Sequence, residues 1–363
     1  MFDLAVREDE WAAADTLIRR KFGDKVPYDV RVLFAFQRKD TAGQRQLRVE
    51  GARAAGEKGR RIDRGLEAGL LLSIYLEDLD RADEFTRFST NPSLATRTRA
   101  SAHRFLGDLA VAGGRWTAAK SEFAAAGRLG QSDSALVERS LAATLPFLAV
   151  PKAEIELIRA EVERWKPGSD VSAPLPESIR PLTGHLRLYL LGLLSARLGA
   201  AADALRYAGE LERLPAPPES SALVRELGRT IRADVAGAAG RTAEALALLD
   251  DAKGEVPFEL IRLPYFSEEH GRYLRSLLLH RAGRDAEALR LAEVAFRGTP
   301  NELQYLAPMH LLRATIYQRL SKRAAAAEQY SRFLKLWGTC DPALRPIVEG
   351  AKVELAGLTA EPQ

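Results

Sequence analysis

HRFLGDLAVAGGRWTAAKSEFAAA, residues 103–126, consists of two helix-forming segments separated by a turn at Gly114. Gly107 lies in the first segment and Ala119 in the second, and the large side chain of Phe123 follows four residues later. Small residues let two helices approach closely, whereas a large apolar side chain fills the space that remains between them. Because glycine marks turns between helical segments, this stretch predicts a helical hairpin.

The same order of small residue, turn residue and alanine recurs along the chain. The copies contain Gly192, Gly199, Ala204 and Leu211; Ala233, Ala236, Gly240, Ala245, Leu249, Ala252 and Pro257; Ser276, Leu279, Gly283, Ala288, Ala295 and Pro300; Ala314, Tyr317, Ser321, Ala326, Tyr330 and Phe333; a weaker Ala142, Leu145 and Ile158; and, for a second helix only, Trp11, Ala14 and Ile18. The turn residues lie 41 residues apart between Gly199 and Gly240, 43 between Gly240 and Gly283, and 38 between Gly283 and Ser321. A repeat of this length indicates stacked helical units.

These copies resemble the tetratricopeptide repeat family over most of the chain. The resemblance implies an all-α fold, a right-handed α-solenoid of about eight or nine helical hairpins with a C-terminal capping helix. A standard repeat of this family has about 34 residues. The longer period therefore predicts longer helices or longer links, such as PNELQYLAP at residues 300–308. Such arrays usually present a surface to another protein, so we expect a non-enzymatic scaffold.

Proline content divides the array into parts. Residues 1–166 are expected to form the N-terminal hairpins, with the first hairpin truncated at Met1, and residues 182–340 the C-terminal repeats. Between them, residues 167–181 are rich in proline and predict a loop, although a hinge between two halves is the alternative. Residues 341–358 predict the capping helix, with Asp341 as its N-cap and Pro342 at its first position.

A narrower resemblance covers residues 314–358. This segment looks like the end of the tetratricopeptide regions in certain bacterial proteins, where the repeats follow a serine/threonine kinase domain or a winged-helix domain. The residues that carry this resemblance are Ala326, Tyr330, Phe333, Leu334, Trp337, Asp341, Pro342, Pro346 and Ala351. Two hypotheses follow, a bacterial signalling scaffold or the regulatory portion of a larger kinase or transcriptional regulator whose effector domain lies upstream.

Composition and charge indicate where the chain is located and what it can bind. No apolar run approaches the roughly 20 residues that span a bilayer, and no secretory signal is visible, so we expect a cytoplasmic protein without membrane contact. The net charge is +4, and the segment from Arg45 to Arg64 carries an excess of the same size. That segment could bind phosphate or an acidic partner, but a solvated helix face is the favoured interpretation. We do not expect direct binding of nucleic acid.

The motifs of common enzymes are missing. The chain has no kinase motifs, no GxxxxGK[ST], no GxSxG and no HExxH. Its five histidines, His103, His185, His270, His280 and His310, lack the spacing of metal ligands, and the single cysteine, Cys340, has no partner for a disulfide. We therefore expect no catalytic residues, no cofactor and no metal.

One row of residues remains as a candidate binding site. In the resembling family the first helix of each hairpin lines the concave face, and the matching residues here are Tyr189, Arg197, Tyr273, His280, Arg281, Gln318 and Arg319. Arginines flanked by tyrosines suit a protein or peptide partner, and an acidic one would form charge-assisted hydrogen bonds. The alternative is that arginine near a helix C-terminus interacts favourably with the helix dipole and needs no ligand. The oligomeric state stays open.

Overall fold

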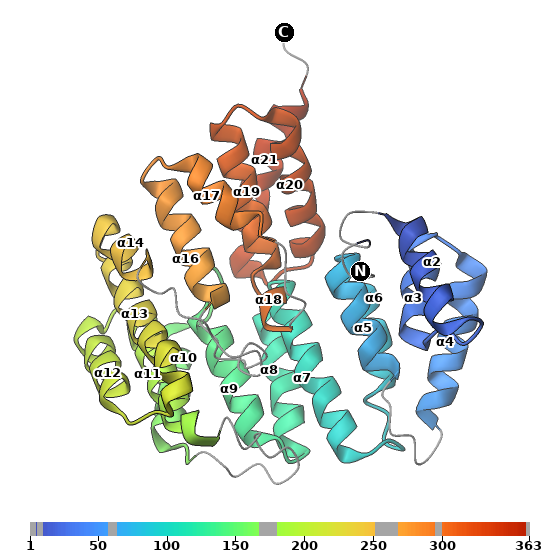
Figure 1. The fold of residues 1–363 in the computed structure, drawn as a ribbon, viewed down its shortest axis with the longest axis horizontal. Coiled ribbons are helices and arrows are strands. Elements are labelled where there is room, and N and C mark those ends of the chain that lie inside the picture. The colour runs from blue at the N-terminus through green and yellow to red at the C-terminus, as the bar shows by residue number, and fades with distance from the viewer. Residues whose placement is uncertain are drawn as a thin grey trace.

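The computed structural model describes residue 5 and residues 10–56, 64–166, 180–250, 268–294 and 300–360. These ranges contain helices and no strand, as Figure 1 shows. The α-helices are α2 (Trp11–Phe22), α3 (Tyr28–Gln37), α4 (Thr41–Gly56), α5 (Arg64–Tyr75), α6 (Leu79–Phe88), α7 (Thr96–Ala112), α8 (Trp116–Arg128), α9 (Ser132–Thr144), α10 (Lys152–Arg164), α11 (Thr183–Arg197), α12 (Ala201–Arg213), α13 (Ser221–Ala238), α14 (Thr242–Asp250), α16 (Glu268–Arg281), α17 (Asp285–Ala292), α18 (Pro300–Leu303), α19 (Leu306–Arg319), α20 (Arg323–Trp337) and α21 (Arg345–Thr359).

Consecutive helices pack as hairpins, and each hairpin packs on the next. The closest pairs are α5 with α6, α7 with α8, α11 with α12, and α19 with α20. Contacts such as those of α6 with α7 and α12 with α13 join neighbouring hairpins into a curved stack (Figure 1). The predicted fold class, an α-solenoid of helical hairpins ending in the helix α21, is confirmed.

The turns of the hairpins depend on a left-handed backbone conformation. Gly114, Gly199, Gly240 and Gly283 all have φ between 68° and 77°, and Ser321 has φ 58°. Glycine adopts this conformation without steric cost, which explains its choice at these turns. The turn positions predicted from the repeat are therefore confirmed.

In two hairpin turns earlier in the chain, a residue other than glycine adopts the left-handed conformation. Lys39 follows α3 with φ 56°, and Glu77 follows α5 with φ 48°. The repeat pattern of the sequence did not predict either hairpin, because lysine and glutamate are not typical turn residues.

Close packing between helices occurs at the small positions of the repeat. A Cβ atom added to Gly107 would lie 2.4 Å from the ring of Phe123, and one added to Gly192 would lie 2.5 Å from Ile231. The matching alanines of the second helices, Ala119, Ala204, Ala245, Ala288 and Ala326, are fully buried. The sequence interpretation that small residues permit close approach is confirmed at these sites.

The stack curves until its C-terminal hairpin meets the N-terminal half. The C-terminal helices lie beside the ends of α5 and α7 in Figure 1, and α18 packs against both helices. Trp337 Nε1 donates a hydrogen bond to the Ala112 carbonyl at 3.0 Å, and the Asp341 amide donates to the Gly114 carbonyl at 3.0 Å. We call these contacts, which join α20 and the following turn to the α7–α8 turn, the seam.

Asp341 has a different role from the one predicted. It makes no side-chain capping bond to the C-terminal helix, where a 3-10 turn at Pro342–Leu344 precedes α21. Its carboxylate instead accepts hydrogen bonds from the amide and hydroxyl of Thr117, at 3.0 and 3.2 Å, in the first turn of α8. Asp341 thus stands at the predicted N-cap position, before Pro342, but its side chain caps a helix more than 200 residues earlier in the chain.

The inside of the curve is filled by the chain itself. Residues 302–310 are all buried. The sequence suggested residues 300–308 as a long link, but α18 and the first turn of α19 occupy most of that stretch. Gln304 donates a hydrogen bond to Asp108 at 3.1 Å, Tyr305 stacks edge-on against Phe147, and His310 lies 3.1 Å from Glu77. We call residues 302–310 the plug, because they occupy the space that an open solenoid would leave as a groove.

Candidate partner-binding surface

Four of the predicted site residues lie together at the C-terminal ends of α16 and α19. His280 and Arg281 end α16, and Gln318 and Arg319 end α19. The Arg319 guanidinium donates a hydrogen bond to the His280 carbonyl at 2.8 Å, which ties the two helix ends together. Arg281, Gln318 and Arg319 are exposed, and His280 is partly buried. We call these four residues the arginine face.

Within the arginine face, most side chains also bind neighbouring helices. Asp285 accepts a hydrogen bond from His280 and lies 3.4 Å from Arg319, and Gln318 donates to Glu354 of α21 at 2.7 Å. The described ranges contain no ion pair of Arg281. Arg281 is therefore the cation of this surface with the most freedom to meet an external carboxylate.

The other three predicted residues lie inside the molecule. Tyr189 is 1% exposed and Tyr273 is 8% exposed, and the ring of Tyr273 lies 5.7 Å from that of Tyr305 in the plug. Burial raises the pKa of Tyr273 to about 12, so its hydroxyl stays protonated. Arg197 is half-buried and donates to the Leu148 carbonyl at 2.9 Å. The seven residues thus do not form one continuous row on the surface.

A buried polar cluster adjoins these tyrosines and had not been predicted. His270 lies between two polar groups, with Nε2 at 2.8 Å from Asp234 and Nδ1 at 3.0 Å from the Tyr305 hydroxyl. Burial by itself lowers the pKa of His270, but the charge and hydrogen bond of Asp234 outweigh this effect and leave that pKa raised. No sequence signal links the three residues, because they come from three different hairpins.

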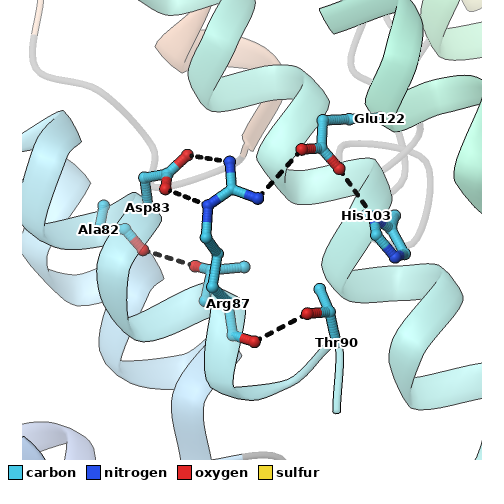
Figure 2. Close-up of polar contacts among 7 residues, drawn as sticks. Ala82, Asp83, Arg87, Thr90, His103 and Glu122 are labelled. Atoms are coloured by element: carbon cyan, nitrogen blue, oxygen red, sulfur yellow. Dashed lines mark hydrogen bonds and ion pairs between the residues drawn. The ribbon is translucent and has the colours of Figure 1, made fainter. Parts of the chain in front are cut away.

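A second polar network connects α6, α7 and α8, as Figure 2 shows. Arg87 donates hydrogen bonds to both oxygens of Asp83 at 2.6 and 3.0 Å and to Glu122 at 3.2 Å. His103 Nδ1 lies 2.7 Å from the other oxygen of Glu122. Burial alone would raise the pKa of Glu122, but His103 and Arg87 lower it. This network joins successive hairpins and has no open coordination site.

The described ranges give little support to a metal site, a membrane-spanning helix or a basic binding segment. No group of three or more histidine, cysteine or acidic side chains there could hold a metal ion. None of the helices in those ranges combines the length and the apolar character needed to cross a bilayer. Within the predicted basic segment, Arg48 is paired with Glu84, while residues 57–63 lie outside the described ranges. Of the proline-rich loop predicted at residues 167–181, residues 167–179 also lie outside them, and the last two residues begin a 3-10 helix at Arg180–Leu182.

Comparison with known proteins gives a likeness among solved structures alone. No family model matches the chain, and no curated protein matches it. Among solved structures, the chain is similar to a tetratricopeptide repeat protein from Parabacteroides merdae, with 15% sequence identity and a TM-score of 0.38. That likeness covers 80% of this chain and 98% of the other.

Proposed function

We propose that this chain is a non-enzymatic helical-repeat scaffold that binds a protein or peptide partner, in a bacterial signalling role. The observation that carries the proposal is the arginine face, where two successive first helices end side by side and present Arg281 and Arg319. Guanidinium groups bind carboxylates through paired, charge-assisted hydrogen bonds. The partner class that fits this surface is therefore an acidic protein segment.

The plug occupies the concave side of the stack, so the proposed partner binds elsewhere. Tyr189 and Tyr273 are buried, and the ring of Tyr273 packs against Tyr305 of the plug, so a partner cannot reach these tyrosines without unpacking the core. The part of the predicted row that a partner can reach is the arginine face, with Arg281 at its centre.

The proposal predicts a loss of partner capture when Arg281 is reversed in charge. Arg281→Glu is the sharper variant, because Arg319 is already bound to His280 and Asp285 and its loss would disturb the packing of α16 on α19. We expect at least about a tenfold drop in capture, since a repulsive charge replaces an attractive one at the interface. The measurement is affinity capture from a lysate of the encoding organism, quantified by mass spectrometry.

Arg290→Glu on α17 is the matched control. Arg290 is exposed, carries the same charge and lies outside the arginine face. We expect this variant to retain the partners that Arg281→Glu loses. Equal capture by the two variants would remove the arginine face from the proposal.

A regulatory role within a larger signalling protein is the second candidate. It is favoured by the segment 314–358, whose residues resemble the end of repeat regions that follow kinase or winged-helix domains. The DNA sequence immediately before the codon of Met1 tests this candidate. An in-frame effector domain there would support it, and a stop codon would contradict it.

A further inference from the structure

The α9–α10 hairpin differs from its neighbours in the way it turns. The backbone of Leu145 is extended, with φ −62° and ψ 121°, and Pro151 precedes α10 in a similar conformation. The hairpin lacks the left-handed residue that closes the turns at Gly114 and Gly199. As a result α9 and α10 pack less closely than the helices of the other hairpins.

A groove of about 530 Å³ lies where this hairpin meets α8. Phe123 and Ala124 of α8 and Leu136 of α9 give it apolar walls, and Arg139, Arg164 and Trp165 give it polar atoms. Sites for small molecules commonly have volumes of about 300–1,000 Å³, mostly apolar walls and a few polar groups. The groove has the size and composition of such a site, and none of its residues belongs to the arginine face.

Two buried donors beside the groove have no acceptor among the described residues. Trp165 is 9% exposed, and its indole Nε1 is buried without a hydrogen-bond partner. The buried Trp116 and Trp337 each use Nε1, donating to Glu154 at 3.1 Å and to the Ala112 carbonyl at 3.0 Å. The Nε atom of Arg139 is also buried and unpaired. Buried N–H groups rarely remain unpaired, and these two atoms lie behind the groove wall, since each has an exposed area below 1 Å².

The charges at the groove indicate which ligand head group fits it. Glu161 neutralises Arg139, and Asp133 has a partner of its own. In the described part of the chain, the exposed Arg164 forms only a hydrogen bond to the Ala160 carbonyl of its own helix. A guanidinium in this situation favours a carboxylate.

We propose that this groove binds a small amphipathic carboxylate, independently of the partner-binding function. The apolar body of the ligand packs against Phe123, Ala124 and Leu136. Its carboxylate pairs with Arg164 at the polar end of the groove. The ligand class is thus a monocarboxylic acid with an aliphatic or aromatic body of small size.

Calorimetric titration with 4-phenylbutanoate tests the proposal on the full chain. We expect saturable binding at one site, at least about tenfold weaker in Ala124→Phe, where the added ring fills the groove. Ala118→Phe, on the exposed side of the same helix and away from the groove, is the matched control and should bind as the unchanged protein does. The melting temperature of each variant verifies that it is folded.

The head group is tested separately. We expect Arg164→Gln to weaken binding of 4-phenylbutanoate about tenfold and to leave binding of the uncharged 4-phenylbutanol unchanged, because only the acid pairs with the guanidinium. No saturable binding at millimolar concentration, or equal binding to the Ala124→Phe variant, would overturn the proposal. Equal binding of the acid and the alcohol would overturn the assignment of a carboxylate.

Discussion

At the scale of single residues, Gly107 shows how the repeat depends on the absence of a side chain. The ring of Phe123 occupies the place of the missing methyl group, so a Cβ atom there would lie 2.4 Å from an aromatic carbon. The side chain of Phe123 is only 1% exposed. A gain in helix propensity therefore competes with a steric clash at this position.

We predict that Gly107→Ala destabilises the protein. Overpacking a dense core costs about 1–3 kcal/mol, which exceeds the roughly 0.5–1 kcal/mol gained when alanine replaces glycine in a helix. Gly350→Ala in α21 is the control, because nothing lies within 4 Å of the added atom and only the helix gain applies. Urea unfolding followed by circular dichroism measures both, and shifts of the same sign would contradict the packing argument.

His270 predicts a dependence of stability on pH. Its pKa in the folded state is raised by Asp234 above the unfolded value of about 6.5. Its contribution to the free energy of unfolding is then complete below about pH 6.5 and is lost as the pH rises through the folded-state pKa. In Asp234→Asn the charge that raises the pKa of His270 is absent, and burial alone lowers that pKa. We therefore expect this variant not to lose the contribution of His270 as the pH rises.

The test compares the free energy of unfolding of the two proteins between pH 6 and pH 9. The difference between unchanged protein and Asp234→Asn should shrink as the pH rises. A difference that stays constant over this range would show that His270 does not titrate as the geometry implies.

At the scale of elements, α8 illustrates a helix whose start is stabilised from a distant part of the chain. Arg115 occupies the N-cap position and makes no side-chain capping bond. The carboxylate of Asp341 supplies the acceptor for the amide of Thr117, and its negative charge lies at the positive end of the helix dipole.

We predict that Asp341→Ala lowers the free energy of unfolding by about 1 kcal/mol, the usual cost of losing an N-cap acceptor. Asp341→Asn should cost less, because the amide oxygen can still accept the bond while the charge is lost. Thermal unfolding by calorimetry ranks the variants. An alanine variant as stable as the unchanged protein would show that water replaces the carboxylate without loss.

At the scale of the whole molecule, the seam and the plug turn an open array into a closed one. Each repeat of an open solenoid contacts only its neighbours. Here Trp337, Asp341 and His310 join hairpins far apart in sequence, so the two ends of the curve support each other.

We predict that the double variant Trp337→Ala and Asp341→Ala expands the molecule. The unchanged protein should have a radius of gyration close to the roughly 21 Å of a compact chain of this length. Without the seam the curve can open, and the radius should increase while helicity by circular dichroism is retained. Small-angle X-ray scattering makes the measurement, and an unchanged radius with retained helicity would show that the plug alone holds the array closed.

The sequence by itself determined the hairpins and their turns. Glycine at the left-handed turns and small residues such as Gly107 and Ala119 are local requirements, so they leave a signal at a fixed spacing. The candidate surface was predictable only where residues lie at exposed helix ends, as for Arg281 and Arg319. The closure of the array, which brings Tyr305 against Tyr273 and Asp341 to α8, follows only from the tertiary structure. Contacts such as Asp341 with Thr117 span 224 residues, and no local periodicity encodes an approach that the summed curvature of the stack brings about.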